Sequence, residues 1–475
     1  MTTTDTTTVD EPSSGLKRSI TGTQLFFYTL GDVLGSGIYV LVGLVAAAVG
    51  GAFWIAFGLG IVVAAITGSA YAELVTKYPR AAGASLYVKK AFGSPVLTFL
   101  VTVSFLSASF AATGSLATGF ASYFATLFDG AGPPALLVSL VFVAVLLVVN
   151  FIGITESVVM NMLMTFVEVA GLLIIMAIGI YHVVQGDADF GVLADVNVDG
   201  NPALAVLAGI AFSFFAMTGF ENTANVAEET VDPHRHFPRS LVGGMVVAGV
   251  VYVLVSMAAA LTVPVDRLAD SDAALLEVVK QGILPFSTDV MATVFSVIAL
   301  VAITNTTLVT LVTQPRILYG MAREDVVPGV FATIHPRRRS PWVGLLFSGL
   351  VVAALLVTGT VVLQAGGGID LVNRLALVTV VFLLFIYALV IVACLRLRGR
   401  DEHEKTFRAN TPLLVLGLVG NLAILAFSIY DDPTSLLWCA GLLALGVVLY
   451  LVERVVGSKG TAARDAAPAG RTPGD

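Results

Sequence analysis

Two carboxylates stand inside segments of the chain that are otherwise apolar. Asp32 interrupts the apolar run 24–48, and Glu168 lies well inside the run 158–184. A charged group in the middle of a bilayer costs at least ~2.5 kcal/mol, so a carboxylate at that depth is expected to have a function. A buried carboxyl group can take up and release a proton. For Glu168 the alternative is a structural hydrogen bond that holds two helices together.

The run around Asp32 also contains the sequence Gly35-Ser36-Gly37. Glycines beside a carboxylate make a poor continuous helix, and the pattern predicts that the helix opens here. We expect an opened helix to leave free the amides of Ser36 and Gly37 and the carbonyls of Val33 and Leu34. A zwitterion with a carboxylate and an ammonium group fits such a gap. The alternative is that the glycines only allow a neighbouring helix to pack closely.

A second interruption is expected in the apolar run 204–226. There Thr218-Gly219 is followed by Glu221-Asn222 in mid-segment, and Gly219 stands 184 positions after Gly35. Each interrupted segment opens a set of five apolar runs, 24–184 and 204–397. This spacing predicts an inverted repeat whose first helices break around a shared site at the middle of the membrane.

A third polar group lies in the run 290–319, where Asn305 and Thr306 stand between two further threonines. Their oxygens can offer neutral ligands to a cation, or a hydrogen bond to a carboxylate. The alternative for any one threonine is a hydroxyl that bonds back to its own helix.

The elements that must position these residues are membrane-spanning helices. Hydrophobic residues make up 57% of the 475 positions and charged residues only 12%. Such a composition is far from that of soluble globular proteins and predicts an all-α polytopic membrane protein. We expect twelve transmembrane helices, near 24–48, 52–75, 96–128, 135–152, 158–184, 204–226, 240–263, 290–319, 342–363, 371–397, 413–430 and 435–456.

The orientation follows from the basic residues. With the N-terminus inside, all but three of the 25 Lys and Arg residues fall in cytoplasmic segments, the exceptions being Arg267, Lys280 and Arg374. This asymmetry predicts a multi-pass protein of the cell membrane with both termini cytoplasmic. We expect disordered tails at 1–16 and 457–475, a ten-helix core at 17–397, and peripheral helices 11 and 12 at 398–456. The net charge of −7 argues against a nucleic-acid partner.

Catalytic and metal sites are not expected. The only cysteines, Cys394 and Cys439, fall inside expected helices, and the five histidines fall at helix ends or in loops. An intramembrane enzyme would need a buried nucleophile and base, which this distribution does not supply. The sequence therefore predicts no enzyme, no metal site and no cofactor.

Three motifs in this order resemble the amino acid, polyamine and organocation permeases, especially bacterial and archaeal relatives of the cationic and neutral amino acid transporters. The motifs are Leu34–Tyr39, then Phe215–Glu221 leading into Ala227-Glu228-Glu229, then Gln314-Pro315-Arg316 leading into Glu324-Asp325. The resemblance covers about residues 17–455. It implies a leucine-transporter-like fold, with five plus five inverted helices of which the first and sixth are interrupted, plus two peripheral helices.

The resemblance also implies a substrate site. The substrate carboxylate would meet the amides of Ser36 and Gly37, and its ammonium would meet backbone carbonyls of Val33, Phe215, Ala216 and Thr218. Met217 and Phe220 are candidates near the substrate side chain.

Several proton-coupled relatives place a lysine in the fifth helix where this chain has Glu168. We therefore hypothesise that Glu168, sharing a proton with Asp32, is the coupling group for H⁺. The rival is Na⁺ held by the same acids with Asn305 and Thr306.

The expected function is secondary active, proton-coupled uptake of neutral or hydrophobic amino acids across the cell membrane by alternating access. Alternatives are a cationic amino acid or polyamine permease, a sodium-coupled symporter, an amino acid exchanger and a transporter-like nutrient sensor. A monomer and a homodimer are both open.

Overall fold

The computed structural model describes residues 16–126, 132–196, 201–271, 273–364, 371–402, 404–444 and 447. In this part of the chain the regular structure is helical, apart from an isolated bridge between Ile20 and Thr230. The α-helices are α1 (Gly22–Leu34), α2 (Ser36–Val49), α3 (Trp54–Lys77), α4 (Gly83–Phe92), α5 (Pro95–Thr126), α6 (Ala135–Ile152), α7 (Ile154–Gln185), α8 (Pro202–Ala216), α9 (Phe220–Thr223), α10 (Pro233–Thr262), α11 (Val265–Ala269), α12 (Ala274–Lys280), α13 (Thr288–Ala322), α14 (Trp342–Gln364), α15 (Leu371–Arg396) and α16 (Thr411–Asp431).

Within the described residues, ten helices are long and apolar enough to cross a membrane. The number is eleven if Gly22–Tyr39 and Leu41–Val49, which meet at an angle of 62°, form one bent span. The expected all-α polytopic architecture is therefore confirmed, but the count of twelve is not. The expected twelfth helix is described only as the short segment Ser435–Ala444. The expected tails lie outside the described residues, except for residue 16.

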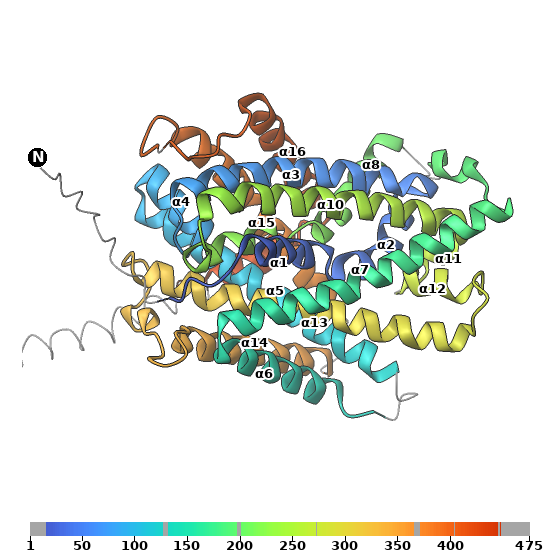
Figure 1. Ribbon diagram of the computed structural model, residues 1–475, viewed down its shortest axis with the longest axis horizontal. Helices are drawn as coiled ribbons and strands as arrows, with labels where there is room; N and C mark the ends of the chain where they lie inside the picture. The colour runs from blue at the N-terminus through green and yellow to red at the C-terminus, as the bar shows by residue number, and fades with distance from the viewer. Residues whose placement is uncertain are drawn as a thin grey trace, which may run out of the picture.

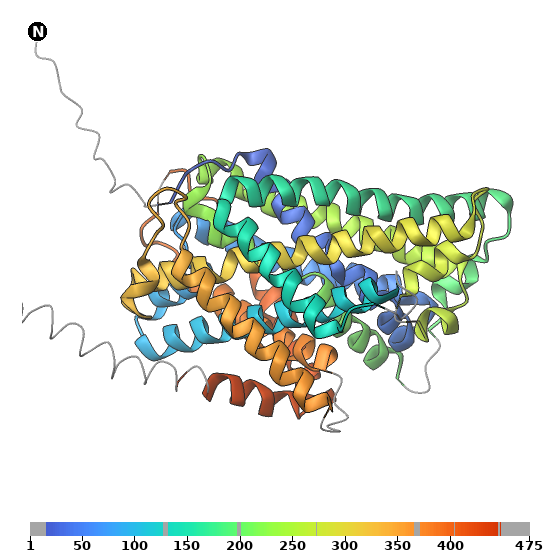
Figure 2. The ribbon, with the colours of Figure 1, turned by 90° about the horizontal axis from the view of Figure 1, so that it is seen from below.

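The long helices run side by side along the long axis of the molecule (Figure 1). α10 packs along α3 and α1, and α5 lies between α13 and α15. α6 and α14 pack together at the outside of the bundle (Figure 2), and Val141, Val145 and Val148 of α6 are each more than half exposed. Apolar side chains exposed around a bundle of spans are suited to contact lipid.

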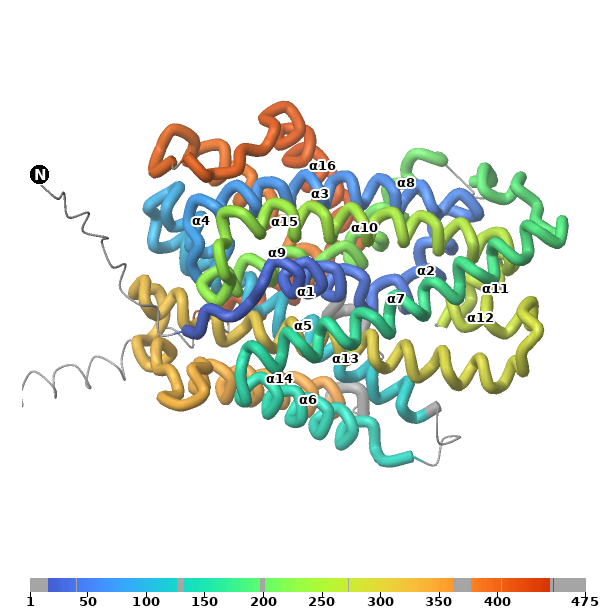
Figure 3. The backbone as a smooth tube through the Cα atoms, viewed as in Figure 1, coloured from blue at the N-terminus to red at the C-terminus, as the bar shows by residue number. Residues whose placement is uncertain are grey.

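Two glycines separate helices near the middle of the bundle. Gly35 lies between α1 and α2 with φ −36° and ψ −151°, which is not helical. Gly219 lies between α8 and α9 with φ +118°, a conformation that side chains disfavour. The tube in Figure 3 shows α1 beside α9, and α1 also packs against α10 and α7. The chain therefore brings non-helical backbone from two distant segments into its interior.

Ion pairs gather at one end of the bundle. The guanidinium of Arg316 on α13 binds the Glu229 carboxylate with Nε–Oε2 and Nη2–Oε1 distances of 2.5 and 3.1 Å. Both side chains are almost fully buried, at 3% and 1% exposure. The amides of Ser19 and Ile20 donate to the Glu229 carbonyl, so the segment before α1 is attached to the same residue.

Candidate functional site

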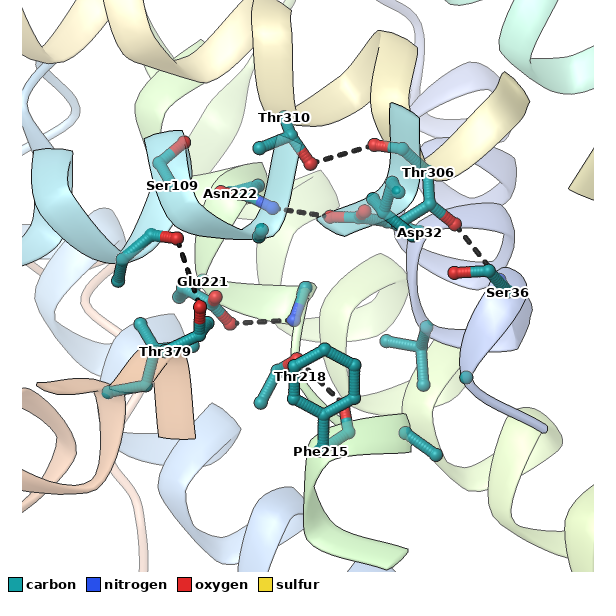
Figure 4. A pocket seen from close by; sticks show the side chains of 18 of the residues that line it. Asp32, Ser36, Ser109, Phe215, Thr218, Glu221, Asn222, Thr306, Thr310 and Thr379 are labelled. Carbon is teal, nitrogen blue, oxygen red and sulfur yellow. Dashed lines mark hydrogen bonds between the residues drawn. The ribbon is translucent and has the colours of Figure 1, made fainter. Parts of the chain in front are cut away.

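A cavity lies where the two non-helical breaks meet (Figure 4). Its volume is about 50 Å³. Its walls come from α1, α2, α5, α8, α9, α13 and α15 and from the residues between α8 and α9. The lining residues are Asp32, Val33, Ser36, Gly37, Phe105, Ala108, Ser109, Ala112, Leu116, Phe215, Ala216, Thr218, Gly219, Glu221, Asn222, Thr306, Thr310, Thr379 and Leu383.

Asp32 forms part of the polar wall. Its side chain is 2% exposed, and Oδ2 accepts a hydrogen bond of 2.9 Å from the Asn222 amide. Oδ1 has no hydrogen-bond partner among the described residues. Gly219 packs against this carboxyl group so closely that a Cβ there would lie 2.8 Å from Asp32 Cγ. The glycine is thus required both for its backbone conformation and for the space that Asp32 occupies.

Glu221 supplies a second carboxyl group to the same wall. Its Oε2 accepts hydrogen bonds from the Gly219 amide, at 2.9 Å, and from the Tyr387 hydroxyl of α15, at 2.5 Å. The lining residues include no lysine or arginine. The described cavity therefore combines two carboxyl groups with hydroxyls and amides, and it carries no fixed cation.

The backbone groups at the breaks are partly occupied by the protein itself. The amide of Ser36 donates to Thr306 Oγ1 over 3.1 Å. The hydroxyl of Tyr252 on α10 contacts two carbonyl oxygens, those of Val33 and Ala216. The expectation that the Ser36 amide and the Val33 carbonyl are free is therefore wrong for this conformation. Side chains of the neighbouring helices satisfy these groups because unpaired backbone groups are costly in a membrane interior.

Gly37 brings the two breaks into direct contact. A Cβ at this position would lie 2.5 Å from the Cα of Ala216 and 2.8 Å from its Cβ. α2 and the end of α8 can approach this closely only because residue 37 has no side chain. The packing of α2 against α8 therefore requires a glycine at position 37, whereas the break itself lies at Gly35.

Glu168 lies away from the cavity, on α7. Its side chain is fully buried, and neither carboxylate oxygen has a hydrogen-bond partner in the described part of the chain. The Tyr39 hydroxyl donates to its backbone carbonyl over 3.0 Å. Glu168 and Asp32 form no hydrogen bond with each other in the described part of the chain, and the sharing of a proton between them stays a prediction. Gly31 of α1 faces Thr165 of α7, whereas Asp32, the next residue, faces Gly219.

The family of this chain follows from its sequence as a whole. The family model described as amino acid permease matches residues 20–449. The chain belongs to this amino acid permease family. The finding confirms the resemblance inferred from the three motifs, and with it the expectation that the protein is a transporter and not an enzyme.

Curated relatives of this permease carry different substrates in their names. The chain is 28% identical to a methylthioribose transporter of Bacillus subtilis, over 74% of this chain and 77% of the relative. It is 24% identical to a branched-chain amino acid permease of the same organism, over 72% and 74%. It is 28% identical to the human cationic amino acid transporter 4, over 72% of this chain and 55% of that protein.

A solved structure shares the fold. The permease is similar to the manganese transporter of Eremococcus coleocola with a TM-score of 0.57 and 15% identity, over 94% of this chain and 98% of that one. At this identity the likeness concerns the fold alone. It agrees with the expectation of a transporter fold built from many spans.

Eight of the twelve residues predicted from sequence line the cavity, namely Asp32, Val33, Ser36, Gly37, Phe215, Ala216, Thr218 and Thr306. The other four do not. Met217 is fully buried, and Phe220 packs in an aromatic cluster with Tyr71 and Tyr387 at ring distances of 5.7 and 5.1 Å. Asn305 and Glu168 lie in the contact between α13 and α7. The roles of all twelve stay predictions.

Sequence reasoning missed the wall formed by α5 and α15. The apolar residues on this wall are Phe105, Ala108, Ala112 and Leu116 of α5 and Leu383 of α15, which packs against α5. The signal was weak, because the small and hydroxyl residues of the run 96–128 fit close helix packing as well as a lining surface. Apolar lining residues give no signal at all in a chain whose helices are apolar throughout.

Proposed function

We propose that this permease is a secondary active transporter that takes up neutral or hydrophobic amino acids together with protons, by alternating access. The observation that carries the proposal is the cavity, which has two carboxyl groups at the helix breaks and, on α5 and α15, a mostly apolar wall that also carries the hydroxyls of Ser109 and Thr379. Such a division suits a molecule with a charged backbone and an apolar side chain.

The polar wall offers hydrogen-bond donors to the carboxylate of a zwitterion and an acceptor to its ammonium group. The amide of Gly37 stands in the first turn of α2, where helix amides have no partner in their own helix, and the Ser36 hydroxyl lies beside it. These donors suit a substrate carboxylate. The unpaired Oδ1 of Asp32 suits the ammonium group. Binding of the ammonium at the Val33 carbonyl would require the Tyr252 hydroxyl to move away from it.

The architecture that we propose is the twelve-helix form with two inverted repeats, 24–184 and 204–397, each opened by an interrupted helix. Support comes from the positions of the breaks, at Gly35 between α1 and α2 and at Gly219 between α8 and α9. Rocking of the elements around these breaks would expose the cavity to one side of the membrane and then to the other.

Glu168 is the proposed proton carrier. A buried carboxylate without a donor costs several kcal/mol, so we propose that Glu168 holds its proton in this conformation. Movement of α1 against α7 during the cycle would admit water to this carboxyl group and release the proton. Asn305 lies on α13 in the same contact with α7, where its amide donates to Thr165 Oγ1 over 3.2 Å.

A cationic amino acid is the second candidate substrate. Asp32 and Glu221 both line the cavity, and no lysine or arginine lines it. An additional positive charge on the substrate side chain would find a partner in Glu221 if the Tyr387 hydroxyl turned away. A panel that includes leucine, isoleucine, arginine and lysine separates the two candidates.

Uptake by purified protein in proteoliposomes tests the proposal. Radiolabelled substrates are offered with an inward proton gradient, with an inward sodium gradient and with neither. One coupled proton and a difference of one pH unit support at most about tenfold accumulation. Accumulation driven by sodium alone, or exchange that needs preloaded substrate, would contradict proton coupling, and binding without flux would favour a sensor.

The variant Glu168→Gln tests the proton carrier. It should still exchange labelled for unlabelled substrate but lose accumulation driven by the proton gradient, because the amide cannot carry a proton. Glu156→Gln is the matched control, since Glu156 is an exposed carboxylate on the same helix. Proton-driven accumulation by Glu168→Gln at the wild-type level would refute this role.

A further inference from the structure

A groove on the outside of the bundle lies between the first turns of α1 and α10. Both helices begin at the same end of the molecule and run side by side (Figure 1). The groove is lined by Thr21, Gly22, Thr23, Phe26, Val231, His236, Arg239 and Ser240. It is separate from the central cavity, with which it shares no lining residue.

The floor of the groove is held in place by close contacts. The Ser240 hydroxyl donates to the Gly22 carbonyl over 3.0 Å. The His236 ring packs on Gly22 so closely that a Cβ there would lie 2.2 Å from Nδ1. The start of α1 and the start of α10 therefore form one surface.

The head of the groove attracts negative charge. Arg239 is exposed and forms no ion pair with any described residue. The amides of Gly22 and Thr23 stand in the first turn of α1, where the Thr21 side chain caps only the amide of Gln24. Two acids of the segment before α10 are already paired, Glu228 with Arg323 and Glu229 with Arg316. Asp232, directly before α10, is exposed and has no ion pair in the described structure.

An apolar strip continues from this head along α10. One face of the helix carries Arg239, then Gly243, then Val246, Val247 and Val250, which are 50%, 41% and 55% exposed. At Gly243 a Cβ would meet nothing closer than the Phe26 ring at 3.7 Å, so the strip is open beside that ring. From Arg239 to Val250 the helix rises by ~16 Å, a length that suits part of an acyl chain.

We propose that this groove binds one anionic phospholipid, with the phosphate at Arg239 and an acyl chain along Gly243 and the exposed valines. A charge at the membrane boundary and an apolar strip on the same helix face match the two parts of such a lipid. Basic residues are concentrated at the end of the helix bundle where this groove lies. Their distribution assigns this end to the cytoplasmic side of the membrane.

Native mass spectrometry of the delipidated full-length protein tests the site. The protein is titrated with palmitoyl-oleoyl phosphatidylglycerol, with phosphatidylcholine of the same chains, or with inorganic phosphate. We expect one tightly retained phosphatidylglycerol, with affinity about fivefold lower in Arg239→Gln. Arg235→Gln is the matched control, because Arg235 is exposed one turn earlier on the same helix but does not line the groove.

A second variant tests the acyl-chain part. Gly243→Leu fills the strip without changing charge and should weaken phosphatidylglycerol binding to a similar extent, while circular dichroism confirms that the helical fold is kept. Three outcomes would each overturn the proposal. The first is equal retention of phosphatidylcholine, and the second is an equal effect of Arg235→Gln and Arg239→Gln. The third is full competition by inorganic phosphate together with no effect of Gly243→Leu. None of these measurements depends on transport.

Discussion

The buried pair of Arg316 and Glu229 allows a quantitative prediction. In Glu229→Gln the guanidinium keeps its charge and its 2.7 Å hydrogen bond to the Val312 carbonyl but loses its counter-ion. Two charges about 3 Å apart at an effective dielectric constant near 20 attract each other by ~5 kcal/mol. Removing one partner of such a buried pair generally costs about 3–5 kcal/mol, because the remaining charge is left uncompensated. We expect a loss of that size for Glu229→Gln and for Arg316→Met.

The double variant Glu229→Met/Arg316→Met shows how much of the stability loss in a single variant comes from leaving one charge buried without its partner. It removes both charges while keeping apolar volume, so it should lose less stability than either single variant. The free energy of unfolding is measured by circular dichroism in mixed micelles as the fraction of denaturing detergent rises.

A partly exposed ion pair at the same end supplies the control. Arg80 and Glu324 are 3.7 Å apart, and the Arg80 side chain is 59% exposed. Solvent screens such a pair, so Arg80→Gln should change stability by about 0–1 kcal/mol. If Glu229→Gln cost no more than this control, Arg316 would have to reach water, and the reasoning from burial would be refuted.

Two further variants test the contacts at the breaks. Gly37→Ala forces a Cβ to within 2.5 Å of the Ala216 backbone, so it should reduce uptake at least tenfold. Gly119→Ala is the control: nothing lies within 4 Å of the added Cβ, so uptake should not change. Tyr252→Phe removes the donor to the Val33 carbonyl and should cost about 1–3 kcal/mol of stability, measured as for the ion pair. Unchanged uptake in Gly37→Ala, or unchanged stability in Tyr252→Phe, would contradict the packing described for each.

The sequence predicted the spans well because length and apolarity are local properties. The expected runs from 52 to 430 correspond to helices in the structure, and the run 24–48 corresponds to α1 and α2. The sequence also predicted residues of the polar wall, because Asp32 and Thr218 are polar residues among apolar neighbours. Phe105 and Leu383 do not stand out, because an apolar residue that faces a cavity has the same local sequence as one that faces lipid or a neighbouring helix.

The sequence was least informative about which side of a helix each side chain occupies. Asn305 and Thr306 were grouped as one pair of ion ligands, but adjacent helix positions point about 100° apart. Thr306 lines the cavity and accepts from the Ser36 amide, whereas Asn305 bonds to Asn161 and Thr165 of α7 at 2.7 and 3.2 Å. The structure thus separates a residue that lines the cavity from one that lies in the contact between α13 and α7.

This separation predicts different defects in two neighbouring variants. Thr306→Ala removes the acceptor of the Ser36 amide at the cavity, so it should raise KM for the substrate and leave the dependence of uptake on external pH unchanged. Asn305→Ala removes the amide that bonds Asn161 and Thr165 on α7, the helix of Glu168, so it should shift that pH dependence and leave KM nearly unchanged. Initial rates of uptake, measured across pH and substrate concentration, give both quantities for each variant. The same defect in both would mean that one ion site joins the two residues, and the coupling group would then lie at the cavity and not at Glu168.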